Sequence, residues 1–234
     1  MQNENVAACQ PKILAYNKKN YFEHAGAAGG FIDKHYFPFC RGRIFDSLEE
    51  DDCQYDSEEK VSWTSGAAML IKASIFFEVG GLDDDFFAHM EEIDLCLRIQ
   101  KKGYELRCNP KSSVYHLGGG TLPYNSPEKV YLNFRNNLFL IIKNHSGFLF
   151  SKLLTRMVID SLAALKFLSE GKVKLIWCIL RAHLSVYKNL PLLLNKRKIL
   201  KANQFPILQY KGSIIWAFFV QKNKRYSSLN KRLF

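Results

Sequence analysis

Three carboxylates lie within four positions of the sequence, where they could do acid–base chemistry. They are Glu91, Glu92 and Asp94, in the stretch "FFAHMEEIDLCLRIQKKG". One role for such acids is structural, because each negative side chain in the first turn of a helix stabilises it by about 0.3–1 kcal/mol. The other role is catalytic, because a well-placed carboxylate that accepts the proton of an alcohol contributes roughly 10²–10⁴-fold in rate. Composition leaves both roles open.

The helix expected to carry these acids covers about residues 91–102. Two lysines occupy its last turn and a glycine follows directly, and these are helix stop signals. At helical spacing Glu91 and Asp94 share one face, whereas Glu92 points elsewhere. The three acids therefore need not share a role.

Other side chains offer contacts to a metal, a sugar or a phosphate, each with a structural alternative. His116 ends a predicted strand before "GGGT", and is either a structural histidine or a ligand for an ion such as Mn²⁺. Trp63 either faces the core or stacks on a sugar ring. Arg135, in "FRNN", is either on a solvated helix face or a phosphate contact. Asp83 and Asp85 form an Asp-x-Asp that we interpret as a turn.

The elements that must position these residues alternate at first between strands and helices. A strand interrupted at a proline is expected over residues 5–15, and residues 16–60 are loop-rich. A second strand, "VSWTSGAAMLIKAS" (61–74), contains Gly66, and a glycine inside a strand often marks the close approach of another group. "SIFFEVGG" predicts a short helix, and "YELRCNP" and "SSVYH" predict two more strands. This alternation predicts an α/β domain.

From about residue 126 the pattern becomes almost continuous helix. The segments are "PEKVYLNFRNNLFLIIKN", "FLFSKLLTRMVIDSLAALKFLSE" and "KVKLIWCILRAHLSVYKNL". The charge changes as well: residues 1–147 carry 16 Lys and Arg against 20 Asp and Glu, whereas residues 148–234 carry 17 against two. We therefore expect one domain over 1–147 and a basic amphipathic helical extension over 148–234.

Composition excludes several classes of protein. Six scattered cysteines in a chain of 234 residues predict reduced thiols in a cytosolic setting. The N-terminus does not have the pattern of a signal peptide, and no uncharged apolar stretch reaches the roughly 18–20 residues of a membrane span.

The basic extension has three interpretations. Its helices could pack on the domain over residues 1–147, lie on an anionic membrane leaflet, or bind nucleic acid. The charge permits nucleic-acid binding, but no recognition motif accompanies it. We expect the membrane surface, where apolar faces are buried and each Lys or Arg adds about 1 kcal/mol.

Taken in order, the motifs resemble a known family. The stretch "WTSGAAMLIKASIFFEVGGLDDDFFAHMEEIDLCLRIQKKGYELRCNPKSSVYHLGGG" is similar to the second half of the catalytic domain in family 2 glycosyltransferases. The branch is the rhamnosyltransferase-like one, which builds bacterial surface polysaccharides. "YLNFRNN" matches the Tyr…Arg-Asn helix that follows there. The resemblance covers about residues 5–145.

This resemblance implies a partial GT-A-like, Rossmann-like domain followed by the helical extension, and it implies roles for single residues. Glu92 falls on the family's general base, although the family has Asp there, so the choice between Glu92 and Asp94 stays open and we favour Glu92. His116 falls on a metal-ligating histidine. The expected substrate-binding residues are Trp63, Ser65, Gly66, Glu91 and Arg135.

The activity implied by the resemblance is transfer of a sugar from a nucleotide-sugar donor to a glycan or lipid-linked acceptor, with inversion at the anomeric carbon. A divalent ion, Mn²⁺ or Mg²⁺, would be shared by His116 and an Asp-x-Asp in the first half of such a domain. That half is not visible before Met1, so we expect a C-terminal portion that does not bind its donor fully. The expected location is cytoplasmic, peripheral to the inner face of the plasma membrane. The alternative is a non-catalytic, membrane-associated interaction module derived from such an enzyme.

Overall fold

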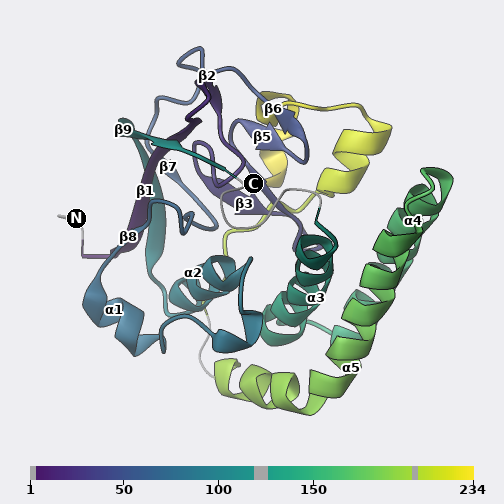
Figure 1. Ribbon diagram of the computed structural model, residues 1–234. Coiled ribbons are helices and arrows are strands. Elements are labelled where there is room, and N and C mark those ends of the chain that lie inside the picture. The colour runs from purple at the N-terminus through teal and green to yellow at the C-terminus, as the bar shows by residue number, and fades with distance from the viewer. Residues whose placement is uncertain (1–3, 119–125, 202–204) are drawn as a thin grey trace. The chain divides into compact units, whose positions relative to one another are not determined.

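The computed structural model describes residues 4–118, 126–201 and 205–234. They cluster into two compact units (Figure 1). The parts of unit 1 are Met1–Leu82, Leu95–Gly118 and Gln204–Phe234, and those of unit 2 are Asp83–Asp94 and Gly119–Asn203. The structural division thus follows chain positions other than the boundary after residue 147 that the charge predicted.

Unit 1 contains a mixed sheet that has five strands within the described residues. Its path is β2–β1–β9–β7, and β8 pairs with β1. The strands are β1 (Val6–Ala15), β2 (Lys18–Phe22), β7 (Glu59–Lys60), β8 (Leu70–Ile71) and β9 (Glu105–His116). β1 and β9 run parallel, and their register shifts twice, between Val6 and Ala8 and between Pro11 and Lys12. The two strands expected over 104–116 are thus the single strand β9. A mixed sheet combined with helices confirms the α/β class.

The strand expected over residues 61–74 is wrong for most of its length. Within this described stretch only Leu70–Ile71 pair in a ladder, and Trp63 makes an isolated bridge. The backbone between them is held by a side chain instead, since Ser65 N donates to Gln10 Oε1 at 2.8 Å. The short helix expected next is confirmed as α1 (Ala73–Glu78).

A second sheet of unit 1 joins four short antiparallel strands of the described chain. They are β3 (Gly30–Ile32), β4 (Pro38–Cys40), β5 (Arg43–Ile44) and β6 (Ser47–Leu48). The rings of Phe31 and Phe39 from this sheet stack with centroids 5.8 Å apart. Tyr226 and Phe234, from the C-terminal part of the chain, pack on Phe31 at 5.4 Å and 5.2 Å. An aromatic core therefore joins distant segments inside unit 1.

Asp33 hydrogen-bonds to the C-terminal part of the chain within unit 1. Its buried carboxylate accepts N–H groups from His35 at 2.8 Å, Phe37 at 2.9 Å and Ile214 at 2.9 Å. Residues 205–234 carry short turns rather than long helices. These are η2 (Trp216–Val220), η3 (Tyr226–Ser228) and η4 (Lys231–Leu233).

Unit 2 is helical. Its elements are η1 (Asp84–Phe86), the first turn of α2 (Glu91–Lys101), α3 (Pro127–Asn144), α4 (Leu149–Ser169) and α5 (Val173–Leu200). α3 packs against both α4 and α5, and these two pack on each other. α5 continues through Pro191, beyond the end at Leu190 that the sequence predicted. Among the helices of the described chain, none is long and apolar enough to cross a membrane.

Candidate active site

The chain enters α2 through a strained turn in unit 2. Phe87, His89 and Met90 have φ angles of 62°, 68° and 70°. Residues other than glycine rarely adopt this left-handed region. Such backbone persists only where surrounding contacts fix it, and it gathers at functional sites. Glu91 follows this turn directly, so the turn sets where the acids of α2 begin.

Two neighbouring residues of α3 hold the turn. Asn136 is buried, and its Nδ2 donates to the carbonyl oxygens of Phe86, Ala88 and His89 at 2.9, 2.7 and 2.7 Å. Arg135 Nη2 donates to Phe86 O at 2.7 Å. The guanidinium thus binds backbone inside unit 2, and its role as a substrate contact stays a prediction. Asn136 stands beside Arg135 in "FRNN", where the sequence suggested a solvated helix face or a phosphate contact for both, and only Arg135 was among the predicted site residues.

Glu92 lies where its charge is poorly solvated. Burial, with a smaller contribution from the charge of Glu91, raises the pKa of Glu92 to about 7. Burial also raises the pKa of Glu91. Oε2 of each residue is buried and has no hydrogen-bond partner in the described part of the chain. A carboxyl group with a pKa near neutrality is suited to both accepting and donating a proton.

Asp94 lies in a different environment from Glu92. Its side chain is fully buried, and its carboxylate accepts hydrogen bonds from Lys143 Nζ and Asn144 Nδ2, each at 2.8 Å. Both donors come from the last turn of α3. These two hydrogen bonds join the first turn of α2 to the end of α3 inside unit 2.

Asp83 and Asp85 belong to a second charged cluster of unit 2. Lys196 Nζ of α5 contacts an oxygen of each aspartate at 2.7 Å. Burial acts to raise the pKa of Asp83, but hydrogen bonds from Lys143 and Lys196 outweigh it and hold that pKa at about 2. Asp83 also caps η1 by accepting from Asp85 N at 3.1 Å. Both aspartates are thus already engaged: Asp83 caps η1, and each of the two forms an ion pair with Lys196.

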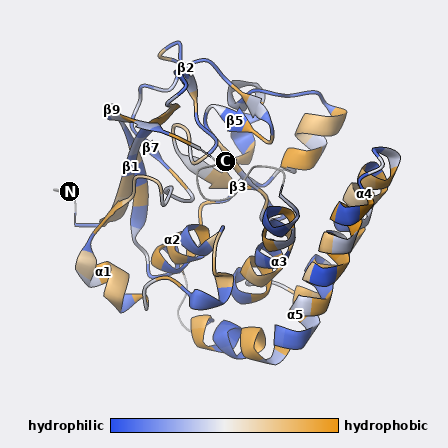
Figure 2. Ribbon diagram, in the orientation of Figure 1, coloured by the Kyte–Doolittle hydropathy of each residue, from blue (hydrophilic) through white to orange (hydrophobic). Residues whose placement is uncertain are grey.

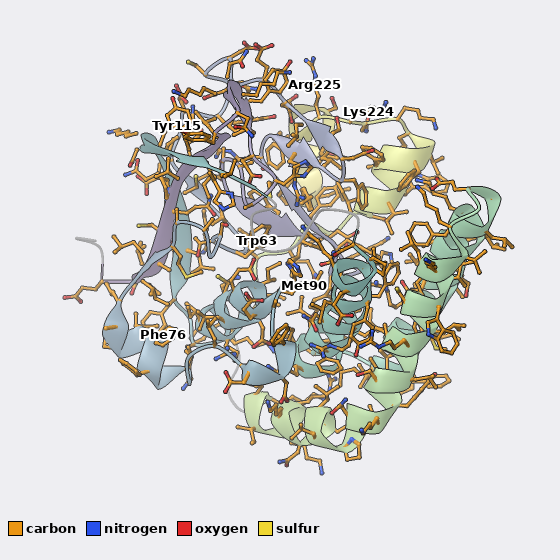
Figure 3. All side chains as sticks on the ribbon, viewed as in Figure 1. Trp63, Phe76, Met90, Tyr115, Lys224 and Arg225 are labelled. Carbon is orange, nitrogen blue, oxygen red and sulfur yellow. The ribbon has the colours of Figure 1, made fainter. Side chains whose placement is uncertain are left out.

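Trp63, Ser65 and Gly66 lie in unit 1 (Figure 3 labels Trp63). The indole is 4% exposed, donates from Nε1 to Phe31 O at 2.9 Å, and packs directly on Gly30. This favours the core role for Trp63 that the sequence left open. Ser65 is buried as well, whereas Gly66 is exposed.

His116 ends β9 in unit 1, with about a third of its side chain exposed. Its Nδ1 lies 3.2 Å from Oε2 of the buried Glu23. Because a carboxylate only accepts, Nδ1 carries the proton in the neutral ring and Nε2 presents a lone pair. The described residues contain no group of three or more His, Cys, Asp or Glu side chains that could hold a metal ion. The glycines at 119 and 120 lie outside the described residues.

The predicted site residues thus fall into two sets. Glu91, Glu92, Asp94 and Arg135 belong to unit 2, and they meet around the start of α2. The remaining four, Trp63, Ser65, Gly66 and His116, belong to unit 1. Gln10 of unit 1 is a further residue that sequence analysis missed: its Oε1 accepts from Ser65 N, and its Nε2 donates to two carbonyl groups.

Comparison with known proteins gives matches to parts of this chain. No model of a known protein family matches it. The N-acetylglucosaminyl-diphospho-decaprenol L-rhamnosyltransferase of Mycobacterium tuberculosis is 30% identical over 91 residues, which are 39% of this chain and 30% of that protein. Rhamnosyltransferase WbbL of Escherichia coli K12 is 38% identical over 60 residues, 26% of this chain and 23% of that protein. The dTDP-rhamnosyl transferase RfbF of Shigella flexneri is 27% identical over 144 residues, 55% of this chain and 48% of that protein.

The resemblance to rhamnosyltransferase-like family 2 glycosyltransferases is confirmed. The matched proteins are named as rhamnosyltransferases, and a hexosyltransferase of low-salt glycan biosynthesis from Haloferax volcanii matches as well, at 28% identity over 106 residues. The chain spans about a third of the length of the Mycobacterium protein that it matches.

Proposed function

We propose that the protein transfers a sugar from a nucleotide-sugar donor to a glycan or lipid-linked acceptor in bacterial surface polysaccharide synthesis. The observation that carries this proposal is Glu92, a carboxyl group with a pKa of about 7 that begins a helix behind a strained turn. The names of the matched relatives support the substrate class. The GT-A fold and the inverting course of the reaction belong to the same proposal.

Glu92 is the general base in this scheme, and Asp94 is a positioning residue. The proton of an acceptor hydroxyl passes to a carboxylate oxygen of Glu92, and the acceptor oxygen forms a bond to the anomeric carbon. The bond from that carbon to the diphosphate oxygen breaks, and the electron pair leaves with the diphosphate. Asp94 does not take the proton because Lys143 and Asn144 already occupy its carboxylate.

A divalent ion, Mn²⁺ or Mg²⁺, is part of the proposal, and His116 would hold it. The contact between His116 Nδ1 and Glu23 fits this role, because a carboxylate partner fixes the ring tautomer that leaves Nε2 for an ion. Such an ion, when bound at a diphosphate, supplies positive charge that stabilises the leaving group.

The test is turnover by the Glu92→Gln variant. We expect it to fall about 10²-fold or more, because glutamine keeps the shape but cannot accept the proton. Transfer from dTDP- and UDP-sugars is measured with the polypeptide encoded by the complete open reading frame. The matched control is Glu58→Gln, an acid of unit 1 whose side chain is 58% exposed, and it should leave turnover unchanged.

Two results would overturn parts of this scheme. Loss of turnover in Asp94→Asn with Glu92→Gln fully active would show that the base is Asp94. Absence of any nucleotide-sugar binding or turnover would favour the non-catalytic interaction module. The membrane surface, at the inner face of the plasma membrane, is the partner that we propose in either case.

A further inference from the structure

Two charged side chains of helix α4, Arg156 and Asp160, are buried within unit 2. Arg156 and Asp160 are 3% and 1% exposed, and Arg156 Nε contacts Asp160 Oδ1 at 2.6 Å. His183 of α5 contacts the other oxygen of Asp160 at 3.0 Å, and Arg156 also donates to Asn137 of α3. The buried side of α4 therefore contains an ion pair, and Leu153, Ile159 and Phe167 of the same helix are partly buried.

The opposite face of α4 is apolar and exposed. A helix of a soluble domain normally buries its apolar stripe and exposes its polar one. The ribbon of α4 carries hydrophobic and hydrophilic segments in turn (Figure 2). In α4 apolar residues also recur at helical spacing along the exposed side. These residues, between 53% and 69% exposed, are Phe150, Leu154, Val158, Leu162, Leu165 and Leu168.

The hydroxyl groups among these apolar residues need no water. Thr155 Oγ1 donates to Ser151 O at 2.9 Å, and Ser161 Oγ donates to Met157 O at 2.9 Å. Ser151 Oγ donates to Phe148 O at 3.1 Å. Each hydroxyl thus satisfies its donor inside its own helix. A helix face of this kind tolerates an environment without water, because its polar groups are already bonded.

Helix α5 continues this apolar surface. Trp177, Leu180, Leu184 and Tyr187 follow one another at helical spacing, and each is at least half exposed. α4 and α5 pack on each other in the same unit. We name the exposed apolar residues of the two helices the α4–α5 surface.

Charge identifies what covers the α4–α5 surface. Residues 148–201 carry 11 basic and two acidic side chains. Asp160 and Glu170 contact basic partners within this range, and Arg181 and Lys196 pair with acids of unit 2 outside it, which still leaves a surplus of basic side chains. If two copies paired through this same surface, cations would face cations across the interface. An anionic lipid headgroup complements the surplus, and acyl chains complement the leucines.

We propose that the α4–α5 surface is inserted into the headgroup–acyl boundary of an anionic bilayer. The helices lie in the plane of the membrane, because α3 and α5 pack on the side of α4 that carries Arg156 and Asp160. Only the other side of α4 is then available to the bilayer. This inference rests on the membrane partner of the proposed function. It adds that insertion of apolar side chains contributes most of the membrane affinity, whereas the basic residues contribute less.

The test is sedimentation with vesicles of phosphatidylcholine, with and without phosphatidylglycerol, in low and high salt. Leu162→Asp should lower the partition coefficient about tenfold or more, because a charge replaces an inserted leucine. Binding of the unchanged protein should persist in part at high salt. The matched control is Phe77→Asp, which changes a 75% exposed apolar residue of α1 in unit 1 and should leave partitioning as it is.

A second readout reports insertion depth. Brominated acyl chains should quench the fluorescence of Trp177, which is 63% exposed, and Trp177→Phe should remove that quenching. Binding that high salt abolishes, with Leu162→Asp inert, would overturn the proposal in favour of electrostatic adsorption. A dimer in solution that Leu162→Asp dissociates, without vesicle binding, would overturn it in favour of self-association.

These measurements are separable from catalysis. Vesicle binding needs neither donor nor acceptor, so Glu92→Gln should sediment with vesicles as the unchanged protein does. Loss of turnover in Glu92→Gln with normal vesicle binding supports the first proposal without bearing on the second.

Discussion

Glu92 starts a helix and at the same time holds a carboxyl group that is poorly solvated. Charge at a helix N-terminus is stabilised by the backbone N–H groups, whereas burial favours the protonated form. Burial is the larger effect here, because the pKa is raised to about 7. Asp94, two residues on, lies in a different environment, because its carboxylate accepts hydrogen bonds from Lys143 and Asn144. Neighbouring acids of one helical turn thus lie in different environments, which is what the proposed separation of their roles requires.

This raised pKa makes stability depend on pH. A carboxyl group with a folded pKa above its unfolded value stabilises the native state fully below the unfolded pKa, and the contribution is lost as the pH rises through about 7. Glu92→Gln should therefore gain about 2–3 kcal/mol in unfolding free energy, relative to the unchanged protein, between about pH 5 and about pH 8. Urea denaturation at several pH values measures this gain, with Glu58→Gln as control. A pH-independent difference would contradict the desolvation of Glu92.

At the scale of elements, α3 positions the start of α2. Asn136 contacts three carbonyl oxygens of one turn, and Lys143 and Asn144 reach Asp94 from the end of the same helix. Because α3 holds both the strained turn and the first turn of α2, the orientation of Glu91 and Glu92 depends on α3 although neither residue is paired with it.

Asn136→Ala should destabilise unit 2 by about 1–3 kcal/mol, because buried carbonyl oxygens lose their donor. Chemical denaturation followed by helix content measures the loss. Asn133→Ala, on the same helix and partly exposed, is the matched control and should have less effect. Equal losses in the two variants would show that the turn does not depend on Asn136.

Local pattern predicted the helices well, because caps and apolar spacing are local. The expected 91–102 compares with Glu91–Lys101 for α2. The strand expected over 61–74 failed because Ser65 N bonds to the side chain of Gln10, 55 positions away. The binding of Arg135 and Asn136 to residues 86–89 is likewise long-range, and nothing in "FRNN" specifies which carbonyl oxygens lie opposite. The roles of Glu92 and His116 stay predictions.

At the scale of the whole molecule, the last segment of unit 1 follows unit 2 in the chain. Residues 205–234 return to the aromatic core of β3 and β4, where Asp33 receives Ile214 N. The basic part predicted from charge therefore serves two units: α4 and α5 belong to unit 2, and the last segment belongs to unit 1.

Asp33→Asn tests how much the contact between Asp33 and Ile214 contributes to the packing of this last segment. An amide has one acceptor oxygen where the carboxylate has two, so the bonds to His35, Phe37 and Ile214 cannot all persist. We expect about 1–3 kcal/mol lower stability of unit 1 and faster hydrogen exchange at Ile214. Exchange in α3 serves as the internal reference and should not change. Unchanged protection at Ile214 would contradict the role of Asp33.

The left-handed turn before α2 has a consequence for the sequences that this fold accepts. At most positions a change to glycine loosens the native backbone, but at Phe87, His89 and Met90 the side chain itself opposes the observed φ angle. Glycine or asparagine at these three positions relieves that opposition. On backbone grounds alone, these three positions therefore accept glycine or asparagine more readily than the Phe, His and Met that they hold.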